Sequence, residues 1–209
     1  MPNLIIIGAR GFGREIFNLA VDCIAAGANF TIKGYLDDKS DALQGYQNYP
    51  PILSSVEDYV IQPEDVFICA LGDVQYKRLY AEKILNKGGR FISLVHPSIH
   101  QWQNTSWGEG CIALRNVVIS CDVTIGNFVT LMDNCIIGHD ARIGNWSHVG
   151  AASLMAGFSS IGSMVTLHPH VELLPHKSVA DNATVGAGSV VLRNVKEGTT
   201  VFGIPATKL

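Results

Sequence analysis

Residues 137–148 read Ile137-Gly138-His139-Asp140-Ala141-Arg142 and then Ile143-Gly144-Asn145-Trp146-Ser147-His148, two six-residue units that both begin with isoleucine and glycine. The six-residue period extends in both directions. Fifteen successive units begin with an apolar residue, at Trp107, Ala113, Ile119, Ile125, Leu131, Ile137, Ile143, Val149, Met155, Ile161, Leu167, Leu173, Val179, Val185 and Val191. Because 47% of the chain is apolar, such a run has a probability of about 10⁻⁵ by chance.

Two further positions of the unit are restricted. The fifth place holds small or branched residues from Cys111 to Val195, with Lys177 as the one long side chain. The second place is often glycine, which predicts a corner that needs positive φ or a tight turn. This pattern fits neither a 3.6-residue helix nor an alternating strand, and it predicts the wall of a β-solenoid. We expect the solenoid over residues 95–196, with a tail at 197–209 outside the six-residue frame.

Residues 1–94 have a different hydrophobic pattern, in which apolar segments typical of strands alternate with amphipathic segments. We expect a small α/β domain with a parallel sheet. The patterns predict strands at 4–7, 31–36, 66–71 and 91–95, helices at 12–26 and 74–87, and a short helix at 54–61.

Composition excludes several classes of protein. The net charge of −3 lacks the basic excess typical of nucleic-acid surfaces. The apolar runs are too short for a membrane span, and the N-terminal residues do not resemble a signal peptide. Five cysteines without a CxxC pair favour reduced thiols in a cytoplasmic protein.

A glycine-rich turn follows the first expected strand and opens the first expected helix. Its sequence is Gly8-Ala9-Arg10-Gly11-Phe12-Gly13, which differs from the GxGxxG dinucleotide fingerprint and disfavours a nicotinamide cofactor. The turn is either a tight strand-to-helix connection or an anion site at a helix N-terminus. Asp37-Asp38 and Gly72-Asp73 end two further strands at the same sheet edge, which favours a binding site.

Two histidines of the solenoid are candidate functional residues. His139 stands third in its unit and is followed by Asp140, a carboxylate that could orient an imidazole base. Eighteen residues later, one coil on, Gly157 leaves room beside the ring and exposes a backbone N–H. His148 interrupts a column of threonines, Thr130, Thr166 and Thr184. An outward-facing polar residue is the simpler interpretation of either histidine.

Other histidines and the cysteines suggest no site. His168-Pro169-His170 lacks a third ligand at a suitable spacing, so we expect no metal. His96, His100 and His176 indicate surface polarity alone. Cys111, Cys121 and Cys135 look like small core fillers.

The whole chain resembles the NeuD/PglD family of bacterial hexapeptide-repeat sugar acetyltransferases. The resemblance rests on the glycine-rich turn, Leu36-Asp37-Asp38, Ala70-Leu71-Gly72, residues 137–150 and Val201-Phe202-Gly203-Ile204-Pro205-Ala206. It implies a Rossmann-like α/β domain followed by a left-handed parallel β-helix with three units per coil. The handedness comes from the family alone, because crossovers are usually right-handed.

The family assigns roles to residues of this chain. His139 would be the general base, Asp140 would raise its basicity, and the Gly157 N–H would stabilise the oxyanion. Acetyl-CoA contacts would fall on His148, Pro169 and Ala187. Sugar-nucleotide contacts would fall on Arg10, Gly11, Phe12, Asp37, Asp38 and Gly72.

Two residues depart from the family pattern. Phe12 stands where members commonly have histidine, which removes a polar contact near the acceptor. Arg10 replaces a residue that is usually small, and it could contact a phosphate or cap the turn. The family also implies a homotrimer with acetyl-CoA between neighbouring prisms.

The expected function is acetyl transfer from acetyl-CoA to the amino group of a nucleotide-linked amino-deoxysugar in bacterial surface-glycan synthesis. The alternatives are O-acetylation of a sialic-acid-like sugar and a non-catalytic sugar-nucleotide-binding module. A degenerate module has no reason to keep an imidazole next to a carboxylate and a bare glycine, and this favours an enzyme.

Overall fold

The computed structural model describes residues 1–209. The chain divides into two compact units, Met1–Pro97 and Ser98–Leu209.

The first unit is a small parallel α/β fold, as predicted. It contains β1 (Asn3–Ile7), α1 (Gly11–Ala25), β2 (Thr31–Leu36), β3 (Ile52–Ser54), β4 (Asp65–Cys69), α2 (Val74–Asn86) and β5 (Leu94–Val95). Four strands form one parallel sheet in the order β3-β2-β1-β4. The central strand β1 is buried from Leu4 to Ile7, so its near-continuous apolar run is explained by cover on both faces of the sheet.

Two sequence-based expectations for this unit are wrong. Residues 54–61 do not form a helix, because β3 extends the sheet to Ser54 and a single turn follows. In that turn the Ser55 hydroxyl accepts from the Asp58 N–H at 3.0 Å and donates to the Asp58 carboxylate at 2.7 Å. No strand covers 91–95 throughout: Phe91 makes one isolated bridge with Phe67, and β5 contains only two residues.

The two helices follow from their sequences. The buried residues of α1, at Gly13, Ile16, Leu19, Ala20 and Cys23, have the spacing of one helical face. Asp73 caps α2, and its carboxylate accepts from the Gln75 and Tyr76 N–H groups at 2.9 and 3.0 Å. Neither helix is long and apolar enough to cross a membrane.

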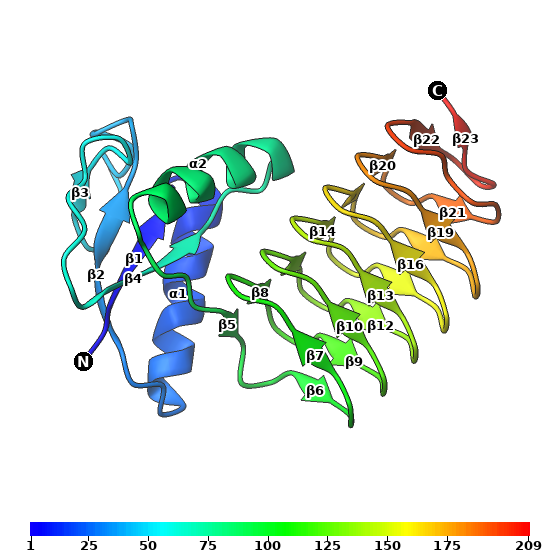
Figure 1. Ribbon diagram of the computed structural model, residues 1–209, viewed down its shortest axis with the longest axis horizontal. Helices are drawn as coiled ribbons and strands as arrows, with labels where there is room; N and C mark the ends of the chain where they lie inside the picture. The colour runs from blue at the N-terminus through cyan, green and yellow to red at the C-terminus, as the bar shows by residue number, and fades with distance from the viewer. The chain divides into compact units, whose positions relative to one another are not determined.

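The second unit is a three-sided parallel β-helix, in which strands of two or three residues lie on three sheets (Figure 1). One sheet has the order β19 (Ser178–Val179), β16 (Ser160–Ile161), β13 (Arg142–Ile143), β10 (Thr124–Ile125), β7 (Ser106–Trp107). Another has the order β21 (Val190–Val191), β18 (Glu172–Leu173), β15 (Leu154–Met155), β12 (Ile136–Ile137), β9 (Val118–Ile119), β6 (His100–Gln101). The remaining sheet contains β23 (Thr207–Lys208), β22 (Thr200–Phe202), β20 (Thr184–Val185), β17 (Thr166–Leu167), β14 (His148–Val149), β11 (Thr130–Leu131), β8 (Ile112–Ala113).

The register confirms eighteen residues per coil. Thr124 pairs with Arg142, and His148 pairs with Thr166. The first and fifth places of the units fill the core of the prism, from Cys111 and Ala113 to Val191 and Val195. The last coil is shorter by two residues, since Thr184 pairs with Thr200 and Val179 bridges Val195. The chain therefore leaves the six-residue frame after Val191.

The role predicted for the glycines is wrong in one respect. Second-place glycines do not have positive φ; a Cβ at Gly138 would lie 2.6 Å from the Gly157 nitrogen, and one at Gly144 would lie 2.4 Å from the Gly162 carbonyl carbon. Glycine is needed there because adjacent coils approach closely. The left-handed residue of each corner is the fourth, and it is usually not glycine, as at Asp140 with φ 58°.

Candidate functional site

His139 and Asp140 form a hydrogen-bonded pair at one corner of the prism. The corner follows β12, and we call residues 139–140, 157–158 and 175–176 the His139 corner. The Asp140 Oδ2 atom lies 2.9 Å from Nδ1 of His139, and both side chains are about half exposed. An ionised carboxylate can only accept, so Nδ1 carries the proton and Nε2 is left with its lone pair. This is the arrangement of an oriented base.

Gly157 lies one coil on, directly against the imidazole. A Cβ at Gly157 would stand 2.5 Å from Nε2 and 2.6 Å from Cε1 of His139. No side chain larger than hydrogen fits between the ring and the next coil. The geometry thus agrees with the space predicted for Gly157.

The N–H of Gly157 has no acceptor within the chain. At some other corners the matching N–H is capped by a side chain one coil on: Asn127 donates to Asn145 Oδ1 at 2.8 Å, and Ser163 donates to Asp181 Oδ1 at 2.9 Å. The residue one coil on from Gly157 is Pro175, whose ring carries no acceptor. A backbone donor therefore remains available beside the imidazole.

The three residues expected to contact acetyl-CoA lie elsewhere on the prism. His148 is on β14, and Pro169 and Ala187 are exposed in the turns that follow the sheet of β14. His148 pairs with Thr130 and Thr166, which places it in the threonine column. These three residues share one face and the corner after it, whereas His139 is at a different corner. One prism does not bring the two sets together.

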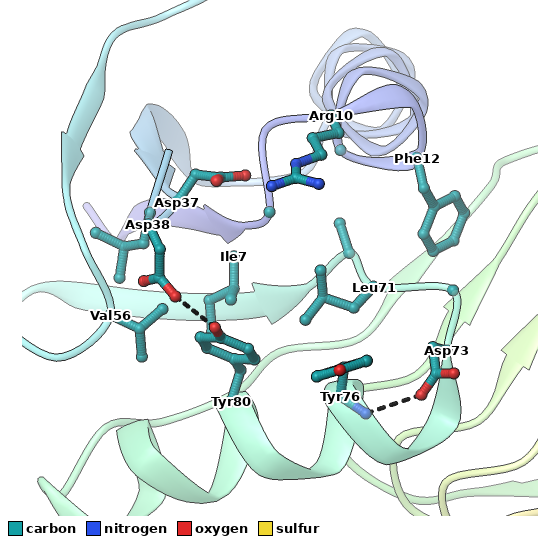
Figure 2. A pocket seen from close by; sticks show the side chains of 15 residues that line it. Ile7, Arg10, Phe12, Asp37, Asp38, Val56, Leu71, Asp73, Tyr76 and Tyr80 are labelled. Atoms are coloured by element: carbon teal, nitrogen blue, oxygen red, sulfur yellow. Dashed lines mark hydrogen bonds between the residues drawn. The ribbon is translucent and has the colours of Figure 1, made fainter. Parts of the chain in front are cut away.

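A pocket of about 510 Å³ opens at the carboxyl edge of the sheet in the first unit (Figure 2). It is lined by the five predicted residues Arg10, Phe12, Asp37, Asp38 and Gly72, together with Ile7, Gly8, Gly13, Leu36, Val56, Ala70, Leu71, Asp73, Tyr76 and Tyr80. Gly11, also predicted, is not among the lining residues, and a Cβ there would meet nothing within 4 Å. The pocket volume is in the range of small-molecule sites.

The two carboxylates of this pocket have different tasks. Asp37 Oδ2 accepts from the Ala9 N–H at 2.8 Å, and its Oδ1 accepts from the Lys39 N–H at 2.9 Å. Asp37 therefore locks the glycine-rich turn to the end of β2. Asp38 instead accepts a short hydrogen bond from the Tyr80 hydroxyl, and Figure 2 shows both side chains facing the pocket. Asp38 does not tie the turn to the sheet, and its side chain lines the pocket.

The hydrogen bond between Tyr80 and Asp38 shifts the pKa of the phenol. The hydrogen bond to Asp38, with partial burial, raises the pKa of Tyr80 to about 12. The phenol thus keeps its proton at neutral pH and donates it in the hydrogen bond to Asp38.

The glycines of the glycine-rich turn allow close backbone packing, and its arginine places a positive charge at the pocket. A Cβ at Gly13 would lie 2.0 Å from the Gly8 carbonyl oxygen, and Gly8 has φ 94°. Arg10 occupies the N-cap position of α1, and its side chain makes no capping hydrogen bond. In Figure 2 its guanidinium points over the pocket. Of the two roles considered for Arg10, the geometry favours contact with an anion.

Sequence reasoning missed the aromatic residues of α2. Tyr76 and Tyr80 line the pocket four residues apart, the spacing of neighbours on one helical face. That spacing directly after Gly72-Asp73 was a signal that could have identified them. His176 is exposed, as predicted, but its ring also stacks on Phe158 in the His139 corner at a centroid distance of 4.9 Å, a contact that the sequence did not indicate. Cys121 is only partly buried, unlike Cys111 and Cys135.

Comparison with known proteins gives matches for both units. Residues 3–84 match the PglD N-terminal domain, and residues 108–151 match the bacterial transferase hexapeptide model of six repeats. The β-helix of the second unit thus resembles that of the hexapeptide-repeat transferases. The two matches show that the chain is similar to the PglD N-terminal domain over its first unit and to hexapeptide-repeat transferases over part of its second.

Among curated proteins, GDP-perosamine N-acetyltransferase of Escherichia coli O157:H7 is 25% identical over 204 residues, which cover 95% of this chain and 81% of that protein. The bifunctional protein GlmU of Acinetobacter baylyi is 32% identical over 117 residues, covering 48% of this chain. The match spans only 26% of GlmU. Among solved structures, PerB from Caulobacter crescentus, in complex with CoA and GDP-perosamine, has a TM-score of 0.89 at 24% identity. That alignment covers 100% of this chain and 98% of PerB.

Proposed function

We propose that this protein transfers the acetyl group of acetyl-CoA to the amino group of a nucleotide-linked amino-deoxysugar, as a step in bacterial surface-glycan synthesis. The observation that carries the proposal is the His139–Asp140 pair beside the unpaired N–H of Gly157. The GDP-perosamine N-acetyltransferase relative and the CoA-bound PerB structure support the class of substrate.

The proposed mechanism assigns one task to each group at the His139 corner. The lone pair of the sugar amine attacks the thioester carbonyl carbon while Nε2 of His139 accepts the amine proton. Asp140 holds Nδ1–H and stabilises the imidazolium that forms. The Gly157 N–H donates to the oxyanion of the tetrahedral intermediate. When the intermediate collapses, the C–S bond breaks, and the leaving CoA thiolate takes the proton from Nε2 of the His139 imidazolium, which restores the base.

The pocket of the first unit would hold the nucleotide part of the acceptor. Arg10 would offset phosphate charge, and Asp38, held in place by the Tyr80 hydroxyl, would accept a hydrogen bond from the base or ribose. Asp37 and Gly72 would shape the turn edges around it. Phe12 would give the acceptor side an apolar contact in place of a polar one.

We further propose that the active form is a homotrimer. In a single prism the His139 corner is separate from the surface of His148, Pro169 and Ala187, so a neighbouring copy is needed to complete the acetyl-CoA site. We place the enzyme in the cytoplasm, a location that agrees with five free cysteines and the availability of acetyl-CoA.

The test is CoA release from acetyl-CoA with a panel of 3-amino and 4-amino UDP-, GDP- and dTDP-sugars, and with sialic acid as an O-acetyl acceptor. We expect turnover with at least one amino-sugar nucleotide and its loss in His139→Ala, with the oligomeric state unchanged. Asp140→Asn should lower kcat by about 10²-fold. Turnover of His139→Ala at the wild-type rate would remove the base from the proposal. Turnover with sialic acid alone would replace N-acetylation by O-acetylation.

A further inference from the structure

Two aromatic rings that the proposed mechanism does not use form a column at the His139 corner. Phe158 and His176 occupy the fourth place of successive coils, above Asp140, and all three have φ near 58–59°. The Phe158 and His176 rings are stacked, with centroids 4.9 Å apart and an interplanar angle of 5°. Phe158 is 50% exposed.

Folding alone does not account for Phe158. The left-handed conformation favours glycine and asparagine and costs other residues about 1 kcal/mol or more. Asparagine occupies the same fourth place at Asn116, Asn134 and Asn182, and the phenylalanine found there at another corner, Phe128, is buried and stacks on Trp146. A phenylalanine that carries this cost and leaves half its surface in solvent contributes little burial in return. This suggests that its ring serves the site.

Phe158 contacts the proposed base directly. Its ring meets the His139 imidazole edge-to-face, with centroids 5.1 Å apart and an interplanar angle of 89°, the preferred geometry of an aromatic pair. The backbone ties the same residues together, because the Phe158 N–H donates to the His139 carbonyl at 2.9 Å and the His176 N–H donates to the Gly157 carbonyl at 3.2 Å.

The imidazole is therefore confined by three different contacts. Asp140 fixes one nitrogen by a hydrogen bond, and Gly157 closes the space toward the next coil. The His139 side chain is half exposed, and of these two contacts only the Asp140 hydrogen bond opposes its outward rotation about χ1. The perpendicular ring of Phe158 stands beside the imidazole, and His176 supports that ring from the following coil.

We propose that Phe158 is a positioning residue that holds His139 in its reactive rotamer, and that His176 keeps Phe158 in place by stacking. This inference rests on the proposed function, in which His139 is the base. It assigns no proton transfer to His176.

The test compares Phe158→Leu, Phe158→Tyr and His176→Ala with a matched control. Leucine keeps apolar bulk but removes the aromatic face, whereas tyrosine keeps the ring. The control is Trp102→Leu, because Trp102 also meets a histidine edge-to-face, His100, at 6.0 Å and 85°. Trp102 is 54% exposed and lies about two coils from His139.

We expect Phe158→Leu to lower kcat about 3- to 10-fold, in line with the weight of one aromatic pair, with the KM for acetyl-CoA unchanged. Phe158→Tyr should restore the rate. His176→Ala should show the same effect in smaller measure and add nothing to Phe158→Leu. Equal rates for leucine and tyrosine, or an equal loss in Trp102→Leu, would overturn the proposal.

A second measurement needs no substrate. The His139 imidazole carbon-bound protons, assigned by difference with His139→Ala, should show a ring-current shift in wild-type protein by NMR. That shift should be lost in Phe158→Leu and kept in Phe158→Tyr. Unchanged resonances in Phe158→Leu would refute the positioning role even if the enzyme is active. A correct shift without acetyl transfer would instead count against the proposed function.

Discussion

Replacing Gly157 by alanine tests the proposed base independently of the proposed oxyanion donor. The variant keeps the backbone N–H of residue 157 but adds a Cβ that would stand 2.5 Å from Nε2 of His139 and 2.6 Å from Cε1. Ordinary contacts between such atoms are about 3.4 Å or longer, so the overlap is close to 1 Å. The imidazole tip has to move, because the alternative is a shift of backbone shared with the core of the prism.

The expected effect of displacing the imidazole is a decrease in kcat. Loss of a positioned general base lowers kcat by about 10²- to 10⁴-fold, and we expect Gly157→Ala to fall in that range. Because the side chain that moves is half exposed, the melting temperature should change little. The assay is CoA release under saturating substrates, with thermal unfolding measured on the same preparation.

The control is Gly198→Ala, in the last coil. Gly198 has φ 62°, and an added Cβ would meet nothing within 4 Å. This variant carries backbone strain without touching His139, and we expect near wild-type kcat. If Gly157→Ala keeps the wild-type kcat, or if Gly198→Ala loses as much activity, the account of how Gly157 and His139 fit together is wrong.

Three further predictions concern the first unit. Asp38→Asn should raise the KM for the sugar nucleotide about 10-fold or more, since a carboxylate acceptor is worth about 1.5–3 kcal/mol, while kcat under saturation stays within a factor of about two. Asp37→Ala should instead lower the free energy of unfolding by about 1–3 kcal/mol, measured by urea denaturation, because two backbone N–H groups lose their acceptor; an unchanged midpoint would contradict its role in locking the turn. Asp65→Asn should lower the free energy of unfolding, measured in the same way, by about 2–3 kcal/mol, because the buried carboxylate accepts from Lys33 Nζ at 2.8 Å and from the Tyr59 hydroxyl at 2.8 Å.

The contribution of Asp65 should also depend on pH. Burial opposes ionisation of this carboxyl group, but the hydrogen bonds from Lys33, the Gln62 N–H and Tyr59 outweigh it and hold the pKa of Asp65 below its usual value. A group with a lowered pKa stabilises the fold above its unfolded-state pKa, about 3.9 for aspartate. The difference in unfolding free energy between wild type and Asp65→Asn should therefore be constant near neutral pH and shrink as the pH falls below about 4. A difference that grows on acidification would contradict this assignment.

The sequence predicted the second unit in detail because a repeat converts distance along the chain into position in space. With eighteen residues per coil, residues that far apart lie one above the other. The period alone therefore places His139 against Gly157, and His148 between its threonine neighbours. The two-residue shortening after Val191 was beyond this reasoning, since it follows from pairing with β22, outside the repeat.

The orientation of the side chains at a corner could be seen only in the tertiary structure. Phe158 and His176 share a column in the repeat, but whether their rings stack on each other or point apart depends on rotamers and on the left-handed backbone at each corner. The period gives no information on either. His176 therefore looked like an ordinary surface residue in the sequence.

In the first unit, too, local sequence patterns predicted the elements, whereas the contacts between them were visible only in the folded structure. Its parallel sheet and glycine-rich turn follow from local patterns, and the rule that parallel strands end at one edge predicted a site there. The different surroundings of the two carboxylates were decided by contacts between distant segments: Ala9 with Asp37, and Tyr80 with Asp38. In a sheet ordered β3-β2-β1-β4 such neighbours are not periodic in the chain, so only the folded structure brings them together.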